Sequence, residues 1–153
     1  MKILYTGFKG QYNSSYRLVN GIDGEKLFLT NSFEGLKNDI ENIYEEFDAV
    51  YMFGLDKNLK NSVRIEKCAS KDGELVYSKM KLDGIEKRLV QYGVENYISD
   101  TPTFYLCNEA YYYMLKKMNG RVVFIHIPSM KNITDELMEG LKNTFELIKE
   151  ASS

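Results

Sequence analysis

Two spacings of apolar residues alternate along this chain, and together they predict a succession of strands and helices. Short apolar runs, continuous or alternating, are typical of strands. Such runs lie at residues 2–6, 25–30, 49–53, 62–70, 94–99 and 121–127. In residues 62–70 the alternation puts Arg64, Glu66 and Cys68 on one face of the strand, opposite Val63 and Ile65.

Between these runs, apolar residues at helical spacing predict helices. A short helix is expected at residues 14–20, and Thr101-Pro102 is typical of a helix start. Four longer helices are expected, each with one apolar inner face. The first follows an N-cap at Ser32 and buries Leu36, Ile40, Ile43, Tyr44 and Phe47, and the second ends near Gly93 and buries Leu82, Ile85, Leu89 and Val90. The third ends at Asn119-Gly120 and buries Cys107, Ala110, Tyr111, Met114 and Met118, and the fourth follows Thr134 and buries Leu137, Leu141, Phe145 and Ile148. Lys71-Asp72-Gly73 is typical of a turn.

This order of elements predicts the fold class and the domain organisation. Strands that alternate with helices favour a central, twisted sheet, largely parallel or mixed, with helices on both faces. The expected fold class is α/β, in a three-layer α/β/α arrangement. Residues 1–153 are expected to form a single domain, because no repeat or linker divides them.

Composition and charge fit a globular domain and exclude some partners. The 153 residues are 44% hydrophobic and 27% charged, with a net charge of −2. No basic block suggests a nucleic-acid surface, and no apolar stretch approaches the roughly twenty residues that span a bilayer. We therefore expect neither nucleic acid nor a membrane as a partner.

The two cysteines, Cys68 and Cys107, indicate a reducing compartment because they are too few for a disulfide scaffold. No cluster of cysteine and histidine suggests zinc, so no metal or cofactor is expected. The opening residues lack the apolar length and cleavage site of a signal peptide. These features predict a cytoplasmic protein with free thiols.

His126, the only histidine, stands at the end of the most strongly apolar strand. Open α/β sheets bind ligands outside the carboxyl ends of their strands, which favours a functional role for this residue. A core histidine that finds its partners in the backbone is the alternative interpretation.

Cys107 is the better placed of the two cysteines to act as a nucleophile. It is expected near the start of its helix, where the helix dipole and free N–H groups favour a thiolate with a lowered pKa. The same N–H groups stabilise an oxyanion during acyl transfer. The alternative is a buried, inert cysteine on an apolar helix face. Cys68, in mid-strand, has no such donors.

Glu66 places an acidic side chain on a strand face that would otherwise be suited to burial in the core. One interpretation pairs it with Arg64, two residues away on the same face. The other has Glu66 accept a hydrogen bond from the ring of His126 and so fix the tautomer of that ring. The spacing leaves both interpretations open.

Three segments resemble the pyroglutamyl peptidase (pyrrolidone-carboxylate peptidase) family of cysteine peptidases. The opening KILYTGF is similar to the first strand and TGF motif of that family. The stretch FGLDKNLKNSVRIEKCA is similar to its glycine-led loop and glutamate strand. The third segment, GVENYISDTPTFYLCNEAYYYML followed by VVFIHIP, is similar to the motifs at the family's nucleophile and histidine.

The resemblance implies an activity and a set of roles. Cys107 would be the nucleophile, His126 the general base and acid, and Glu66 the residue that orients His126. The implied pocket for the pyroglutamyl ring is lined by Phe8, Tyr105 and Leu106, with Tyr12 in place of a second phenylalanine. The implied activity is removal of an N-terminal pyroglutamyl residue from peptides, without a cofactor. Self-association is also typical of the family.

One departure from the family pattern leaves two other functions open. Residues 71–78 are too few to supply the arginine–isoleucine pair that helps to build the family's oxyanion site and pocket. A relative without catalysis that binds a ligand or partner is therefore one alternative. The other is a cysteine hydrolase that acts on a different small amide or ester.

Overall fold

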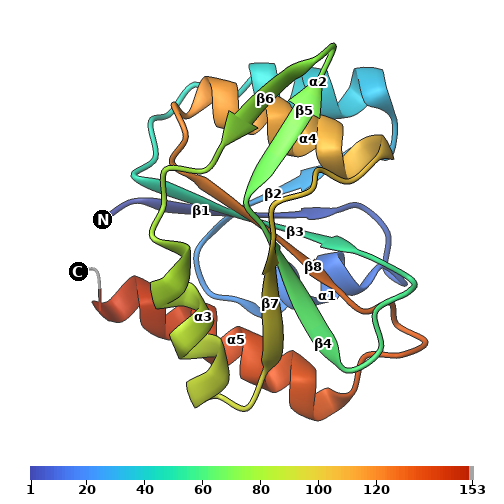
Figure 1. Cartoon of the computed structure of the whole chain (residues 1–153), viewed down its shortest axis with the longest axis vertical. Helices are drawn as coiled ribbons and strands as arrows, with labels where there is room; N and C mark the ends of the chain where they lie inside the picture. Colours follow the sequence, from blue (N-terminus) through green and yellow to red (C-terminus); the bar gives the residue numbers. More distant parts are fainter. Residues whose placement is uncertain (152–153) are drawn as a thin grey trace.

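A six-stranded sheet forms the centre of the molecule, with strand order β2-β1-β3-β8-β4-β7 (Figure 1). The computed structural model describes the backbone of residues 1–151 and the side chains of residues 1–146. The strands are β1 (Ile3–Phe8), β2 (Glu25–Leu29), β3 (Ala49–Leu55), β4 (Ser62–Glu66), β7 (Glu95–Ser99) and β8 (Val122–Ile127). All neighbouring strands are parallel except β4 and β8, which are antiparallel.

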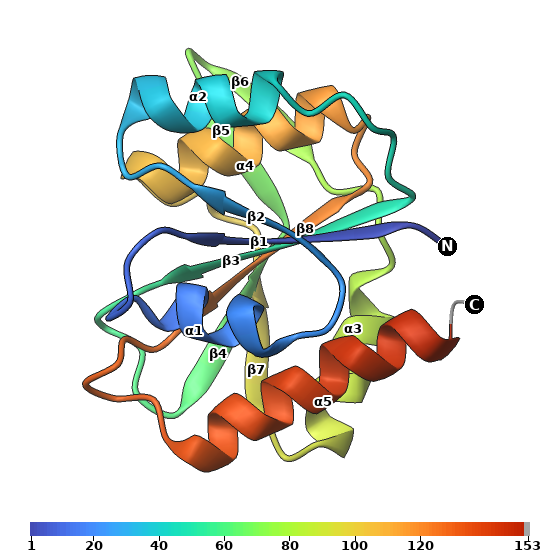
Figure 2. The same cartoon turned by 180° about the vertical axis from the view of Figure 1, so that it is seen from behind.

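Helices cover both faces of this sheet, and the predicted three-layer α/β/α fold class is confirmed. The helices are α1 (Ser14–Gly21), α2 (Phe33–Glu41), α3 (Leu82–Gln91), α4 (Tyr105–Lys117) and α5 (Asp135–Ala151). One face carries α1, α3 and α5, and the other carries α2 and α4 (Figure 2). Within residues 1–151, no helix has both the length and the apolar character needed to cross a membrane.

Each face of the sheet has its own apolar layer, because alternate residues of a strand point to opposite sides. Tyr51, Phe53, Ile125 and Ile127 belong to the layer beneath α1, α3 and α5. Val50, Met52, Val122 and Phe124 belong to the layer beneath α2 and α4. The predicted inner face of the last helix is buried at Leu137, Leu141 and Phe145, and the side chain of Ile148 lies outside the described residues.

The prediction of one strand over residues 62–70 is wrong. The chain leaves the sheet after Glu66 and forms a separate hairpin of β5 (Cys68–Lys71) and β6 (Glu74–Tyr77). Because this hairpin packs on α4 instead of extending the sheet, Cys68 and Ala69 are both buried. The predicted turn is confirmed: Asp72 and Gly73 have φ of 50° and 82°, as a tight two-residue hairpin turn requires.

Helix boundaries follow the predicted caps where the capping residue has its partner. The side chains of Ser32 and Thr134 accept hydrogen bonds from Gly35 and Leu137. The helix after Ser32 ends at Glu41, so Ile43 and Tyr44 lie beyond it, and Tyr44 is 89% exposed.

The helix start predicted at Thr101-Pro102 is also wrong, because α4 begins at Tyr105. Residues 101–104 instead carry the chain from β7, at the edge of the sheet, to α4, whose side chains pack above β3 and β8.

Polar contacts with the hairpin and with β4 fix the position of α4. The side-chain amide of Asn108 donates to the Ser70 carbonyl at 2.7 Å and accepts from the Ser70 N–H at 3.0 Å. One turn further along the helix, the buried Tyr111 hydroxyl donates to the Glu66 carbonyl at 2.8 Å. The start of α4 is therefore held in register with the end of β4.

Replacing Tyr111 by phenylalanine tests this connection. Tyr111→Phe leaves the Glu66 carbonyl without its buried donor, so we expect the free energy of unfolding to fall by about 1–2 kcal/mol. Urea denaturation measures the change. Tyr44→Phe, which removes a hydroxyl from an exposed ring, is the matched control and should leave the free energy unchanged. Equal effects of the two substitutions would contradict the anchoring role.

Candidate active site

Four neighbouring strands place one row of residues side by side on the face beneath α4. Gly54 on β3 is the register partner of His126 on β8, which is the partner of Arg64 on β4. Arg64 is in turn the partner of Tyr97 on β7. Register partners point to the same side of a sheet, so these residues form a continuous floor.

Glu66 lies in the next row, immediately behind His126. It is the register partner of Phe124 on one side and of Ser99 on the other. This placement depends on the reversed direction of β4. Because β4 runs antiparallel to β8, its final residue lies beside Phe124, two residues before His126.

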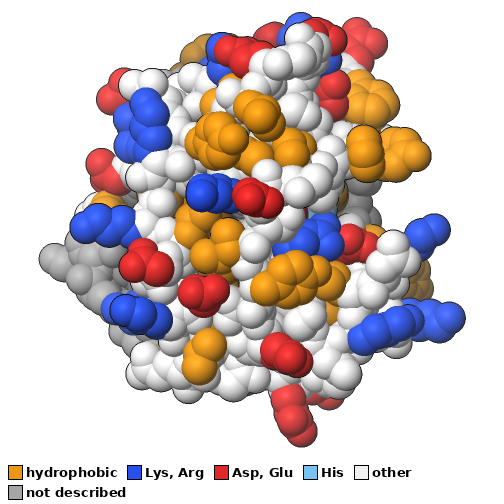
Figure 3. Space-filling view, viewed as in Figure 1, with side chains coloured by type: hydrophobic (Ala, Val, Ile, Leu, Met, Phe, Trp, Pro, Cys, Tyr) orange, Lys and Arg blue, Asp and Glu red, His pale blue; other side chains and the backbone are white. Residues whose placement is uncertain are grey.

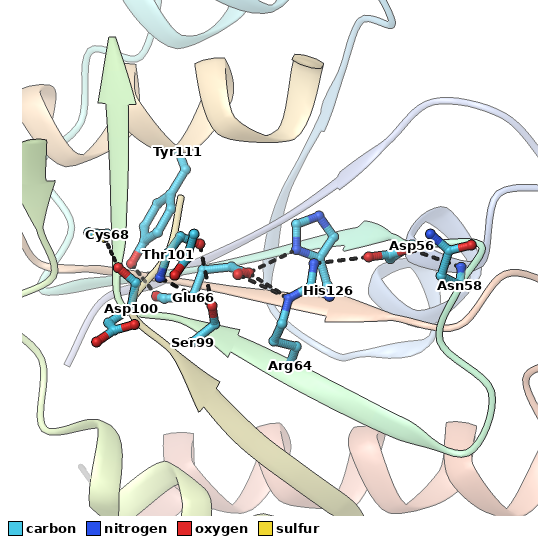
Figure 4. Close-up of polar contacts among 10 residues, drawn as sticks. All are labelled: Asp56, Asn58, Arg64, Glu66, Cys68, Ser99, Asp100, Thr101, Tyr111 and His126. Carbon is cyan, nitrogen blue, oxygen red and sulfur yellow. Dashed lines mark hydrogen bonds and ion pairs between the residues drawn. The ribbon is translucent and has the colours of Figure 1, made fainter. Parts of the chain in front are cut away.

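The Glu66 carboxylate contacts both of the residues that the sequence offered as its partners (Figure 4). Its Oε2 atom lies 2.9 Å from Arg64 Nε and 3.4 Å from His126 Nδ1. The side chains of Glu66 and His126 are 4% and 5% exposed. The two interpretations of Glu66 are thus compatible, because one carboxylate oxygen serves both neighbours.

The contact with Glu66 selects the protonated nitrogen of the His126 ring. A carboxylate can only accept hydrogen bonds, so Nδ1 carries the hydrogen when it faces Glu66. In the neutral ring, Nε2 then carries no hydrogen and is the nitrogen that can accept a proton. The Phe124 ring, whose centroid is 4.8 Å from that of His126, packs against the imidazole.

Asp56, just beyond the end of β3, extends the charged cluster. Its Oδ2 atom lies 3.0 Å from Nη2 of Arg64, so this guanidinium joins Asp56 to Glu66. Burial opposes ionisation of Asp56, but hydrogen bonds from the Asn58 N–H and from Arg64 outweigh it and lower the pKa of the carboxyl. For Arg64, burial is likewise outweighed by hydrogen bonds to Glu66, Tyr97 and Asp56, which raise the pKa of its side chain.

Cys107 stands above the same row, as the third residue of α4. A Cβ atom placed on Gly54 would lie only 2.7 Å from Cys107 Sγ and 2.7 Å from the Phe124 ring. The thiol therefore rests on Gly54, one strand away from His126 and on the same face of the sheet. Glycine at position 54 is what leaves room for the sulfur.

The thiol of Cys107 is not in the state that its place in the helix predicts. Burial, together with the negative charges of Glu66 and Asp56, raises the pKa of this thiol to about 12, and Arg64 offsets only part of the effect. The expected lowering of the pKa by the helix start is therefore wrong. The raised pKa favours the protonated form of this thiol at neutral pH.

The start of α4 provides N–H groups beside this sulfur. Its N-cap, Phe104, makes no side-chain capping bond, so the first N–H groups of the helix have no side-chain acceptor there. Tyr105 has a φ of 68°, in the left-handed region that side chains rarely adopt. Such strain is stored where the surrounding structure holds a residue for function.

The row and the start of α4 border one cleft, with a volume of about 720 Å³. Cys107 and His126 both line it, as do Tyr105 and Leu106 from the predicted pocket. The lining also includes Asp56, Arg64, Tyr97, Ser99 and residues 101–104.

Phe8 and Tyr12, predicted for the pocket, lie outside this lining. Phe8 is 4% exposed and belongs to the apolar layer beneath α2 and α4, while its N–H donates to Ser15 Oγ at 3.0 Å. Tyr12 is 76% exposed in the turn before α1. Cys68 also lies outside the cleft; its thiol donates to the Asp100 carbonyl, and burial raises its pKa.

Asp56 and Arg64, the charged cleft residues that contact each other beside His126, were not predicted as part of the site. Asp56 follows the apolar run of β3 within three residues, and an acid just beyond the carboxyl end of a buried strand is the signal that could have found it. Arg64 was considered only as a partner of Glu66, because its place beside His126 requires the antiparallel pairing of β4. Among the described residues, no group of three or more histidine, cysteine, aspartate or glutamate side chains could hold a metal ion.

Comparison with known proteins gives similarity of structure but not of sequence. No protein-family model and no curated protein sequence matches this chain. The solved structures that it resembles include a mutant pyrrolidone carboxyl peptidase from the hyperthermophile Pyrococcus furiosus, with a TM-score of 0.78, 22% identity and 100% of each chain covered.

Two further structures agree with this result. The pyrrolidone carboxyl peptidase of Fervidobacterium islandicum AW-1 has a TM-score of 0.78 at 20% identity, over 99% of this chain and 98% of the other. That of Thermus thermophilus has a TM-score of 0.77 at 20% identity, over 95% and 98%. The chain therefore has a pyrrolidone carboxyl peptidase fold, and the predicted structural resemblance is confirmed.

The high pKa of Cys107 predicts a specific pH dependence of alkylation. In a Cys68→Ser background, the rate of reaction with iodoacetamide should rise about tenfold per pH unit from pH 7 to above pH 10, because only the thiolate reacts. Glu66→Gln removes a negative charge, lowers the pKa of the thiol and should speed alkylation at pH 8. A rate that already levels off below pH 8 would contradict a protonated resting thiol.

Gly54→Ala tests whether the sulfur needs the space above β3. The added Cβ collides with Cys107 Sγ and the Phe124 ring, so we expect a loss of stability of about 1–3 kcal/mol and an altered rate of Cys107 alkylation. Gly84→Ala is the control, because a Cβ there meets open space. Unfolding curves and alkylation rates that match wild type would show that Sγ does not rest on Gly54.

Proposed function

We propose that this protein is a cysteine amidohydrolase that removes an N-terminal pyroglutamyl residue from peptides through Cys107, His126 and Glu66. The observation that carries the proposal is the alignment of these residues on one face of the sheet. The thiol rests on Gly54, His126 occupies the neighbouring strand, and Glu66 lies behind His126. The fold shared with pyrrolidone carboxyl peptidases supports the same reaction.

In the proposed reaction, the proton of the Cys107 thiol passes to Nε2 of His126 as the sulfur attacks the substrate carbonyl. The resulting imidazolium is stabilised by the Glu66 carboxylate at Nδ1. Because the resting thiol is protonated, the proton transfer takes place with substrate bound, when the carbonyl is positioned for attack. His126 then gives the proton to the departing amine, and water cleaves the thioester.

The negative charge that develops on the substrate oxygen needs donors close to the sulfur. The uncapped N–H groups at the start of α4 fit this role, because they point toward the end of the helix where Cys107 lies. Arg64 also lines the cleft beside His126, but its guanidinium is directed to Asp56 and Glu66, so the helix N–H groups are the donors that we assign to this role.

One observation favours a second candidate, a cysteine hydrolase of another small amide or ester. Phe8 and Tyr12 lie outside the cleft, so two of the side chains expected to hold the lactam ring do not contribute to it. The catalytic residues would be the same, and the acyl group recognised would differ. A panel of acyl amides and esters distinguishes this candidate from a pyroglutamyl peptidase.

The setting of the protein is part of the proposal. Cys68 and Cys107 are both free thiols, which fits a reducing cytoplasm. Of the run Tyr111 to Tyr113, Tyr111 is buried in the core and its two neighbours are half-buried. The latter two rings could take part in self-association.

Hydrolysis of a fluorogenic pyroglutamyl amide tests the function. Wild-type protein should release the fluorophore, and Cys107→Ser should lower kcat by at least about a thousandfold, because the nucleophile is lost. The Cys68→Ser variant is the matched control and should retain the wild-type rate. Full activity of Cys107→Ser would contradict the assignment of the nucleophile.

The proposed role of Glu66 predicts a graded loss in the same assay. Glu66→Gln keeps the shape of the side chain but removes the charge that stabilises the imidazolium, so kcat should fall by about ten- to a thousandfold. His126→Ala removes the base itself and should reduce kcat further. An unchanged kcat in Glu66→Gln would return Glu66 to a purely structural pair with Arg64.

A further inference from the structure

The cleft extends well beyond the three proposed catalytic residues, toward the edge of the sheet. Its floor continues from Gly54 and His126 to Arg64 and Tyr97, which lie on successive strands. Strands are spaced by about 4.8 Å, so the floor from Gly54 to Tyr97 is about 14 Å long. An extended peptide advances by about 3.4 Å per residue, so this floor has room for several residues of a substrate.

The direction of the leaving group follows from the position of His126. The group that protonates the departing amine must lie on the side of that amine, and His126 lies between Cys107 and the outer part of the floor. The residues that follow the scissile bond are therefore directed over Arg64 and Tyr97. The acyl group is left on the opposite side of Cys107.

Three exposed aromatic rings line the cleft. Tyr97 is 46% exposed, Phe104 is 78% exposed and Tyr105 is 80% exposed. The rings of Phe104 and Tyr105 lie edge to face with centroids 6.4 Å apart. On the molecular face that shows β7, hydrophobic side chains gather in several groups with charged side chains between them (Figure 3).

Two of these rings border the side of the cleft to which the leaving group is directed. Tyr97 belongs to the floor, and Phe104 lines the same cleft from the segment that precedes α4. The guanidinium of Arg64 is directed to Asp56 and Glu66, so its charge is compensated by these two carboxylates. Aromatic pairs stabilise one another beyond the effect of the area that they bury.

We propose that Tyr97 and Phe104 form a binding subsite for an aromatic side chain in the first two residues after the scissile bond. The proposal rests on the proposed function for the direction of the substrate. It adds a substrate class: acylated peptides with phenylalanine, tyrosine or tryptophan at one of the two positions that follow the N-terminal residue. Specificity then comes from the leaving group as well as from the acyl group.

The first part of the test is kinetic, and it compares the kcat/KM of different substrates within each variant. Three pyroglutamyl tripeptide amides are compared, with Phe-Ala, Ala-Phe or Ala-Ala after the scissile bond. Wild type should favour one of the phenylalanine substrates by about tenfold in kcat/KM over Ala-Ala, and Phe104→Ala and Tyr97→Ala should each bring this ratio close to one. Tyr44→Ala, an exposed ring away from the cleft, should keep the wild-type ratio.

A binding arm separates failure of the subsite from failure of the proposed function. Phe-Ala amide, Ala-Phe amide and Ala-Ala amide are titrated into the wild-type protein, and the backbone amide signals of Tyr97 and Ser99 are followed by NMR. Saturable shifts at lower concentrations of one of the phenylalanine peptides, lost in Phe104→Ala, are the expected result. They would support the subsite even if no pyroglutamyl amide were cleaved.

Results of three kinds would contradict the proposed subsite. Equal kcat/KM for the three substrates, or equal affinity for the three dipeptide amides, would show that Tyr97 and Phe104 do not recognise an aromatic side chain. Shifts confined to residues away from the cleft would have the same meaning. Phe104→Ala decides the case if Tyr97→Ala does not fold, because Phe104 lies in an exposed loop.

Discussion

A single buried carboxylate, that of Glu66, holds the candidate active site together. An ionised group that is almost wholly removed from water is strongly destabilising unless charged or hydrogen-bonding partners surround it. Arg64 supplies the charge and His126 the ring nitrogen, and both contact the same oxygen. The antiparallel pairing of β4 with β8 is what brings these three side chains together.

The same cluster determines the chemistry of the sulfur. Burial and, after it, the excess negative charge of two carboxylates over one guanidinium raise the pKa of the Cys107 thiol. A protonated nucleophile is protected from oxidation and alkylation, which require the thiolate. In the proposed mechanism, Cys107 reacts only when a bound carbonyl, the helix N–H groups and His126 act together, so a low reactivity of the resting thiol accompanies selectivity for a positioned substrate.

The features that the sequence predicted correctly depend on residues close in the chain. Ser32 and Thr134 cap helices through bonds to residues three positions away, and Asp72-Gly73 makes a turn with its own backbone angles. The alternation of strands and helices likewise sufficed for the α/β class. The roles expected of Cys107, His126 and Glu66 came from a resemblance of motifs and remain predictions.

What could not be predicted depends on contacts between distant segments. The reversed direction of β4 places Arg64 beside His126, and no local pattern reveals which neighbour a strand will have. Thr101-Pro102 is a good helix start that the path from β7 to α4 overrides. The high pKa of Cys107 comes from burial and from acids 41 and 51 positions away, against the local effect of the helix end.

The central claim is that Cys107 forms a thioester while His126 takes its proton. Rapid quenching with an activated pyroglutamyl ester, followed by mass spectrometry of the digested protein, tests it most directly. The account predicts an acyl group on the peptide that contains Cys107, formed far more slowly in His126→Ala; ester turnover with acylation of Cys68, or with no acylated cysteine, would contradict it.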